Sequence, residues 1–166
     1  MKLAETTYDN SETGCCAPLD VAQWDEQELT WQDKPFLKDH IRAFLHIPLN
    51  FGTVVARDHA AIEAAEAYPE RPFWMSDEKS PWGSDLYTAI DGDVPGAEVE
   101  RLSGTFLSKV FEGPYREART WVKKMRDFVR GRGHETEKVY FYYASCPKCA
   151  KHFGKNRVVV IAKVGR

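Results

Sequence analysis

Four cysteines have types and spacings that allow chemistry. Cys146 and Cys149 form a CPKC pair directly after a run of aromatic residues, while Cys15 and Cys16 are adjacent near the N-terminus. A CxxC pair acts in redox catalysis when it opens a helix, because the helix N-terminus stabilises the thiolate. The segment "CAKHFGKN" leaves room for about one helical turn before the next strand. Redox catalysis is therefore disfavoured.

A zinc site is the alternative use of these thiols. The turn of a CPxC hairpin lets two thiolates bind one ion, and a tetrahedral structural site needs two further ligands. Cys15, Cys16 and His152 are the candidates. Adjacent cysteines rarely both reach one ion, however. We therefore expect reduced thiols that pack the N-terminal segment against the hairpin, with no cofactor required and zinc as the variant to test.

Hydrolysis would need an acid to protonate a leaving or carbonyl oxygen, and a group to position water. Glu112 with Tyr142 is the first such pairing, and Glu78 is the reserve. Surface charge explains each carboxylate equally simply. His40 and His46 lie in a predicted strand and are interpreted as structural. The sequence contains no GxSxG, HExxH, P-loop or dinucleotide-binding motif.

Aromatic residues are abundant, with five Trp, seven Tyr and nine Phe. In the strand "VYFYY" alternation puts Tyr140 and Tyr142 on one face, and Phe141 and Tyr143 on the other. Phenols are costly to bury without partners, so the set facing away from the helices would line a cleft or a wet interface. Core packing explains the same pattern, and both interpretations stay open. The predicted ligand-binding residues are Trp74, Tyr87, Phe106, Tyr140 and Tyr142.

A basic stripe lies beside the apolar stripe of the strongest predicted helix. Its members are Arg116, Arg119, Lys123, Arg126 and Arg130. Such a stripe would supply only phosphate contacts to a nucleic acid, and it has no aromatic interleaving. A solvated helix face is the expected role. An interaction module built on the helix at 115–130 is the alternative, and nucleic acid is not an expected partner.

Composition and length indicate a folded protein of one domain or two small halves, because 166 residues carry 43% hydrophobic and 29% charged residues. No apolar run is long enough for a membrane span, and the N-terminus lacks a signal peptide. We therefore expect a cytoplasmic monomer or homodimer. Residues 1–90 carry 7 basic and 16 acidic residues, whereas residues 91–166 carry 16 and 9. Two halves that attract each other would explain this asymmetry.

The elements repeat one plan. Residues 1–33 are predicted to be an extended arm. A first copy at about 38–92 and a second at about 100–166 each give strand, helix, strand and strand. An apolar stripe in the second copy predicts a helix over Tyr115–Arg130. The fold class predicted is α+β, with tandem β-α-β-β modules that form one antiparallel sheet and carry both helices on one face.

Three segments of the second copy resemble the DNA gyrase inhibitor-like (GyrI-like) domains. They are "VFEGPYREARTWV", "YYASCP" and "RVVVIAKV". The resemblance is clearest over roughly residues 102–166, and it reaches about residue 38 through the repeat. The stretches "IPLNFG", "SDEKSPWGSDLY" and "CPKCAKHFGKN" look like a bacterial branch of that family often labelled as hydrolases.

This resemblance implies two β-α-β-β modules related by pseudo-twofold symmetry, which bind flat, apolar, often cationic small molecules in a cleft of the sheet. Some members of the family hydrolyse reactive cyclopropane-bearing compounds. We therefore expect residues 34–166 to form a GyrI-like domain that binds planar or apolar small molecules in an aromatic cleft. Hydrolysis of reactive compounds is the activity that the resemblance adds.

Overall fold

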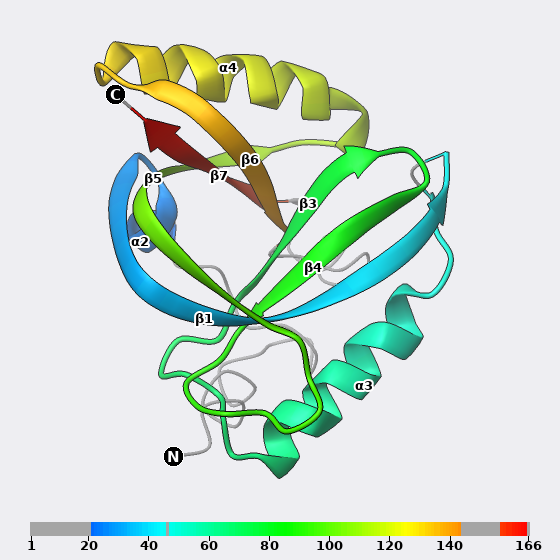
Figure 1. The fold of residues 1–166 in the computed structure, drawn as a ribbon. Helices are drawn as coiled ribbons and strands as arrows, with labels where there is room; N and C mark the ends of the chain where they lie inside the picture. The colour runs from blue at the N-terminus through cyan, green and yellow to red at the C-terminus, as the bar shows by residue number, and fades with distance from the viewer. Residues whose placement is uncertain (1–20, 46, 144–156, 166) are drawn as a thin grey trace. The chain divides into compact units, whose positions relative to one another are not determined.

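The computed structural model describes residues 21–45, 47–143 and 157–165, and these residues fall into two compact units (Figure 1). Unit 1 contains Asp33–Leu102. Unit 2 contains the described residues up to Gln32 together with those from Ser103 onward. The chain passes between the units inside two long strands, β1 (Gln27–Phe44) and β5 (Val99–Glu112). A positive φ lies near each passage, 51° at Asp33 and 130° at Gly104.

Unit 1 is an antiparallel sheet with one helix. After β1 and the short β2 (Ile47–Pro48) come α3 (Phe51–Ala64), β3 (Trp74–Ser80) and β4 (Gly83–Ala89). β4 pairs with both β1 and β3, so the strand order is β1–β4–β3. The sequence of α3 is rich in alanine, which has the highest helix propensity. The helix turns Val54 and Ile62 toward Leu37, Ile41 and Leu86 of the sheet.

Unit 2 has the same order of elements. The short helix α2 (Val21–Trp24) precedes the first residues of β1, and the later part of β5 leads to a 3-10 turn at Tyr115–Glu117. Then follow α4 (Ala118–Gly131), β6 (Glu135–Tyr143) and β7 (Arg157–Gly165). β7 pairs antiparallel with both β5 and β6, which gives the order β5–β7–β6.

The core of unit 2 lies between α4 and one face of this sheet. The helix contributes Trp121, Met125 and Val129, which recur at i, i+4 and i+8 and are at most 2% exposed. On each strand alternate residues face the helix, and they are odd-numbered on β5 and β6 and even-numbered on β7. These strand residues are Leu107, Phe111, Phe141, Val158, Val160, Ala162 and Val164.

The α+β class, the antiparallel pairing and the strand–helix–strand–strand order of each half are therefore confirmed. The helix predicted over Tyr115–Arg130 is present, with its first turn in the 3-10 form. A common sheet with both helices on one face stays a prediction. In the described part of the chain, no helix combines the length and the apolar character needed to span a bilayer.

One boundary prediction was wrong. The turn-forming residues of "DEKSPWGS" predict a connector between two short strands, "RPFWMS" and "DLYTAI", but β3 runs through Ser80 and β4 begins at Gly83. The polar residues of this segment pair across the hairpin, with Asp77 opposite Asp85 and Ser80 opposite Gly83. Asp, Pro and Gly are depleted in strands, but here the pairing of β3 with β4 outweighs that preference, and Asp77 is 4% exposed. The composition of this segment therefore exaggerated the length of the connection.

Candidate functional site

The face of the unit 2 sheet that points away from α4 carries several of the predicted site residues. Tyr142 pairs with Val159, and Tyr140 pairs with Ile161, whereas Phe141 and its partner Val160 belong to the α4 core. Directly paired residues of neighbouring strands share a face, and alternate residues of one strand share a face. By the same rule Phe106, Ser108 and Glu112 of β5 lie with Tyr140 and Tyr142. We call this surface the aromatic face.

Two tryptophans from the N-terminal part of the chain cover the aromatic face. The ring of Trp24 meets Tyr142 edge to face, with ring centroids 5.5 Å apart, and the ring of Trp31 lies 4.3 Å from Phe106. Tyr140 and Phe106 are 1% and 0% exposed, whereas Tyr142 and both tryptophans are half-buried. Part of this ring surface is therefore accessible at Tyr142 and the tryptophans.

Hydrogen bonds fix the tryptophan-bearing segment (Trp24–Trp31, the Trp segment) to β5. The fully buried Ser108 donates its hydroxyl to the carbonyl of Trp24 at 2.6 Å. The backbone N–H of Val110 donates to the Asp25 carboxylate at 3.0 Å. The ammonium of Lys109 lies 3.5 Å from the Glu26 carboxylate. These contacts position Trp24 over Tyr142.

Asp25→Ala is expected to loosen the Trp segment while the sheet stays folded. The change removes the only side-chain acceptor described for the Val110 N–H and should cost about 1–2 kcal/mol of unfolding free energy. Trp24 should then become more accessible, and acrylamide quenching of tryptophan emission should rise. Glu28→Ala, a nearby change at an exposed side chain, is the control. Unchanged quenching in Asp25→Ala would contradict this anchoring role.

The first catalytic pairing predicted from the sequence falls on one face of unit 2. Glu112 is paired with Arg157, and Tyr142 is paired with Val159, two residues further along β7. The intervening β7 separates the two side chains, so they share a face without direct contact. Glu112 is exposed, and its carboxylate accepts a hydrogen bond from Arg157 Nε at 3.1 Å.

The predicted site residues of unit 1 are placed differently. Trp74 pairs with Thr88 and packs on the α3 side, with its ring 5.8 Å from that of Phe51. Tyr87 is the next residue along β4, so it points to the opposite face, where it is 1% exposed. Trp74 and Tyr87 therefore do not line one wall together. The reserve carboxylate, Glu78, is half-buried in β3.

The cysteine predictions fall outside the described residues. Cys15, Cys16, Cys146 and Cys149 all lie there, as do His46 and His152. Among residues 21–45, 47–143 and 157–165 there is no group of three metal-ligating side chains. A zinc site at the cysteines stays a prediction. The basic stripe of α4 is exposed throughout, as a solvated face would be, and Arg130 pairs with Asp127 at 2.7 Å.

Sequence reasoning missed an acidic pair between β1 and α3. Asp58 is 4% exposed and shares a hydrogen bond with Asp39, whose carboxylate also accepts from Arg57 Nη2 at 2.6 Å. Burial, and then the hydrogen bond and charge of Asp39, raise the pKa of Asp58 to about 7. Burial also acts to raise the pKa of Asp39, but its hydrogen bonds with Asp58 and Arg57 hold that pKa below the ordinary value.

A signal for Asp58 was present in the sequence. Asp58 stands four residues after Val54 and four before Ile62, so a helix at this place turns it toward the apolar side. A lone acid on the buried stripe of a helix needs a hydrogen-bonding partner, and in the structure that partner is Asp39. The identity of the partner depends on the packing of α3 against β1.

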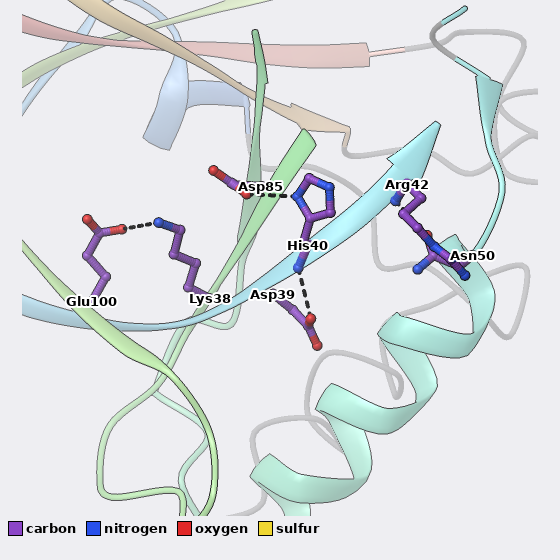
Figure 2. Close-up of polar contacts among 7 residues, drawn as sticks. All are labelled: Lys38, Asp39, His40, Arg42, Asn50, Asp85 and Glu100. Carbon is purple, nitrogen blue, oxygen red and sulfur yellow. Dashed lines mark hydrogen bonds and ion pairs between the residues drawn. The ribbon is translucent and has the colours of Figure 1, made fainter. Parts of the chain in front are cut away.

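Charged and polar side chains also gather on the face of unit 1 that points away from α3. His40 Nδ1 lies 3.2 Å from Asp85 Oδ1, and Lys38 Nζ lies 3.6 Å from Glu100 Oε2 (Figure 2). Figure 2 shows His40 and Asp39 projecting to opposite sides of β1. His40 was predicted to be structural, and nothing in its sequence neighbourhood indicated Asp85 as a partner.

A further histidine, His59 of α3, contacts the hydroxyl of Tyr68 through its Nδ1. Burial lowers the pKa of His59, and the charge of Glu63 opposes that effect. An imidazole that is neutral and hydrogen-bonded in this way links α3 to the segment that follows it. This role is structural.

Comparison with known proteins gives a family match over nearly the whole chain. A family model described as bacterial hydrolase matches residues 6–164. No curated protein is significantly similar in sequence.

Several solved structures share the fold. A hydrolase from Listeria innocua has 14% identity and a TM-score of 0.61, with 85% of this chain and 92% of that chain covered. An uncharacterized conserved protein from Listeria innocua has 13% identity and a TM-score of 0.59 over the same shares. The EcmrR C-terminal domain has 9% identity and a TM-score of 0.58, with 86% and 98% covered. The resemblance to GyrI-like domains is confirmed at the level of the fold.

Proposed function

The chain belongs to the bacterial hydrolase family, and on that premise we propose that it binds a planar, apolar small molecule at the aromatic face of unit 2 and hydrolyses it. The observation that carries the proposal is the pairing of Trp24 with Tyr142, two half-buried rings from separate segments at 5.5 Å. Rings in this arrangement offer both apolar surface and a phenolic hydroxyl to a flat ligand.

The chemistry available beside these rings fits addition of water to a reactive compound. Glu112 and Tyr142 share the aromatic face, so a ligand stacked on Tyr142 can extend toward the Glu112 carboxyl group. We assign Glu112 the proton transfer and Tyr142 the positioning of water. Arg157, which pairs with Glu112 at 3.1 Å, holds that carboxylate in place. Electrophilic planar compounds are the substrate class that this arrangement suits.

Titration with a planar tricyclic dye, acridine, tests the binding. The dye is expected to quench tryptophan emission, because Trp24 and Trp31 lie on the aromatic face. Tyr142→Ala should weaken binding about 10-fold, since it removes an aromatic contact worth roughly 1 kcal/mol together with buried apolar area. Product analysis with electrophilic planar compounds then tests turnover, which Glu112→Gln should reduce.

A matched control is available in the same unit. Tyr115 is 44% exposed and packs against Tyr143 on the α4 side of the sheet. Tyr115→Ala should therefore bind the dye as the wild type does. Equal affinity of the wild type and Tyr142→Ala would remove the aromatic face as the site. Binding without products would reduce the proposal to a carrier or sensor.

A further inference from the structure

The strand register of unit 1 aligns three titratable side chains in one row. His40 of β1 lies opposite Asp85 of β4, and Asp85 lies opposite Asp77 of β3. All three project from the face away from α3, because the alternate residues Ile41 and Leu86 pack against the helix. A histidine beside two acids on adjacent strands has the residue types used in general acid–base catalysis.

The contact with Asp85 determines which nitrogen of His40 is available. Asp85 Oδ1 lies 3.2 Å from Nδ1, and an ionised carboxylate only accepts hydrogen bonds, so Nδ1 carries the proton. The lone pair of the neutral ring then lies on Nε2. The His40 side chain is 61% exposed, which leaves the ring open to water and to a small substrate.

The absence of a side chain at position 83 makes room for this ring. A Cβ added to Gly83 would lie 2.7 Å from both Cε1 and Nε2 of His40, closer than such atoms approach. Gly83 pairs with Arg42, one step along the same face. The imidazole therefore rests directly over the glycine, and the orientation of Nε2 depends on that glycine.

Other charges on this face suit a reaction in which His40 becomes positively charged. Asp77 and Asp85 lie directly opposite each other, so their negative charges repel. A positive imidazolium at His40 relieves that repulsion and is stabilised by both acids. Lys38 lies on the same face, two residues before His40, and its ammonium pairs with Glu100 at 3.6 Å, on the side away from the His40 ring (Figure 2). The charged groups around His40 are Lys38, Arg42, Asp77, Asp85 and Glu100.

We propose that His40 and Asp85 form a general-base site that hydrolyses small esters, separate from the aromatic face. His40 Nε2 takes a proton from water while the water oxygen bonds to the ester carbonyl carbon. The resulting oxyanion is solvated by water, because the His40 side chain is 61% exposed. Its collapse breaks the bond to the alkoxide, which takes the proton from the imidazolium and leaves as the alcohol. The carboxylic acid is the second product. His40 is the catalytic residue, and Asp85 is the positioning residue.

Hydrolysis of p-nitrophenyl acetate by the full chain tests this site. His40→Asn is expected to lower kcat/KM about 100-fold, the lower end of the usual contribution of a general base. His134→Asn, a change at a half-buried histidine of unit 2, should leave the rate unchanged. A wild-type rate no greater than that of free imidazole, or equal losses in the two histidine variants, would overturn the proposal.

Two further variants separate positioning from general structural damage. Asp85→Asn should lower kcat about 10-fold with KM unchanged, and Asp85→Glu should restore part of that loss. Gly83→Ala keeps both reacting groups but displaces the ring, so kcat should fall while far-UV circular dichroism stays the same. Unaltered kcat in both Asp85→Asn and Gly83→Ala would overturn the assigned geometry. Acridine binding without ester hydrolysis would overturn this inference and leave the proposed function standing.

Discussion

Trp121→Ala is expected to lower the free energy of unfolding of unit 2 by about 4 kcal/mol, the range measured for loss of a buried aromatic side chain. Trp121 is 2% exposed and stacks on Phe111, with ring centroids 6.1 Å apart and planes inclined by 22°. It lies in the same core as Met125 and Val129, so its removal leaves a cavity that both sheet and helix border.

Urea unfolding followed by far-UV circular dichroism measures this loss. Lys124→Ala, three residues further along α4 on the exposed side, should change the unfolding free energy by less than about 0.5 kcal/mol. A loss below about 1.5 kcal/mol in Trp121→Ala would mean that the α4 core collapses around the cavity, against the close packing described here.

Asp58→Asn is expected to stabilise unit 1 at pH 8 by about 4 kcal/mol while it leaves stability at pH 4 nearly unchanged. In the wild type the pKa of Asp58 is about 7 in the folded state and near the ordinary value of 3.8 in the unfolded chain. The folded protein thus holds a proton that the unfolded chain releases. Unfolding free energy therefore falls as pH rises from about 4 to 7.

The asparagine amide keeps the hydrogen bond to Asp39 but cannot ionise, so the variant should lack this fall. Asp39 affects the unfolding free energy only at lower pH. Its pKa is below the ordinary value, so the stability that its charge provides is lost as pH falls through that lowered pKa. Urea unfolding at pH 4, 6 and 8 provides the measurement, with Asp127→Asn on exposed α4 as the control. Parallel pH curves for wild type and Asp58→Asn would refute the shared-proton interpretation.

The fold was predictable where one periodicity dominated. Trp121, Met125 and Val129 recur at helical spacing, and α4 with its first 3-10 turn lies within about one residue of the predicted range. The strand at β7 was predictable for a different reason, its continuous run of β-branched residues. The β3–β4 connection was not, because Asp77 and Ser80 are residue types that favour turns, and their place in a strand depends on pairing with β4.

The candidate sites were less predictable, because they depend on which strands become neighbours. Alternation alone placed Tyr140 and Tyr142 on one face. The pairing of His40 with Asp85, 45 positions later in the chain, requires the register between β1 and β4. The Trp24–Tyr142 contact requires the Trp segment to pack on β5 and β6, and no local pattern encodes that packing.

The passage of the chain through β1 and β5 has a consequence for synthesis on the ribosome. The described part of unit 1 is the continuous stretch Asp33–Leu102, so its sheet and helix can form as soon as Leu102 has emerged. Unit 2 is split, and its first part, with Trp24 and Trp31, is made long before Phe106 and Tyr142 exist. Nascent chains fold as their segments become available, N-terminal units first. The two tryptophans therefore lack their packing partners, and stay accessible to chaperones, until β5 and β6 have left the exit tunnel.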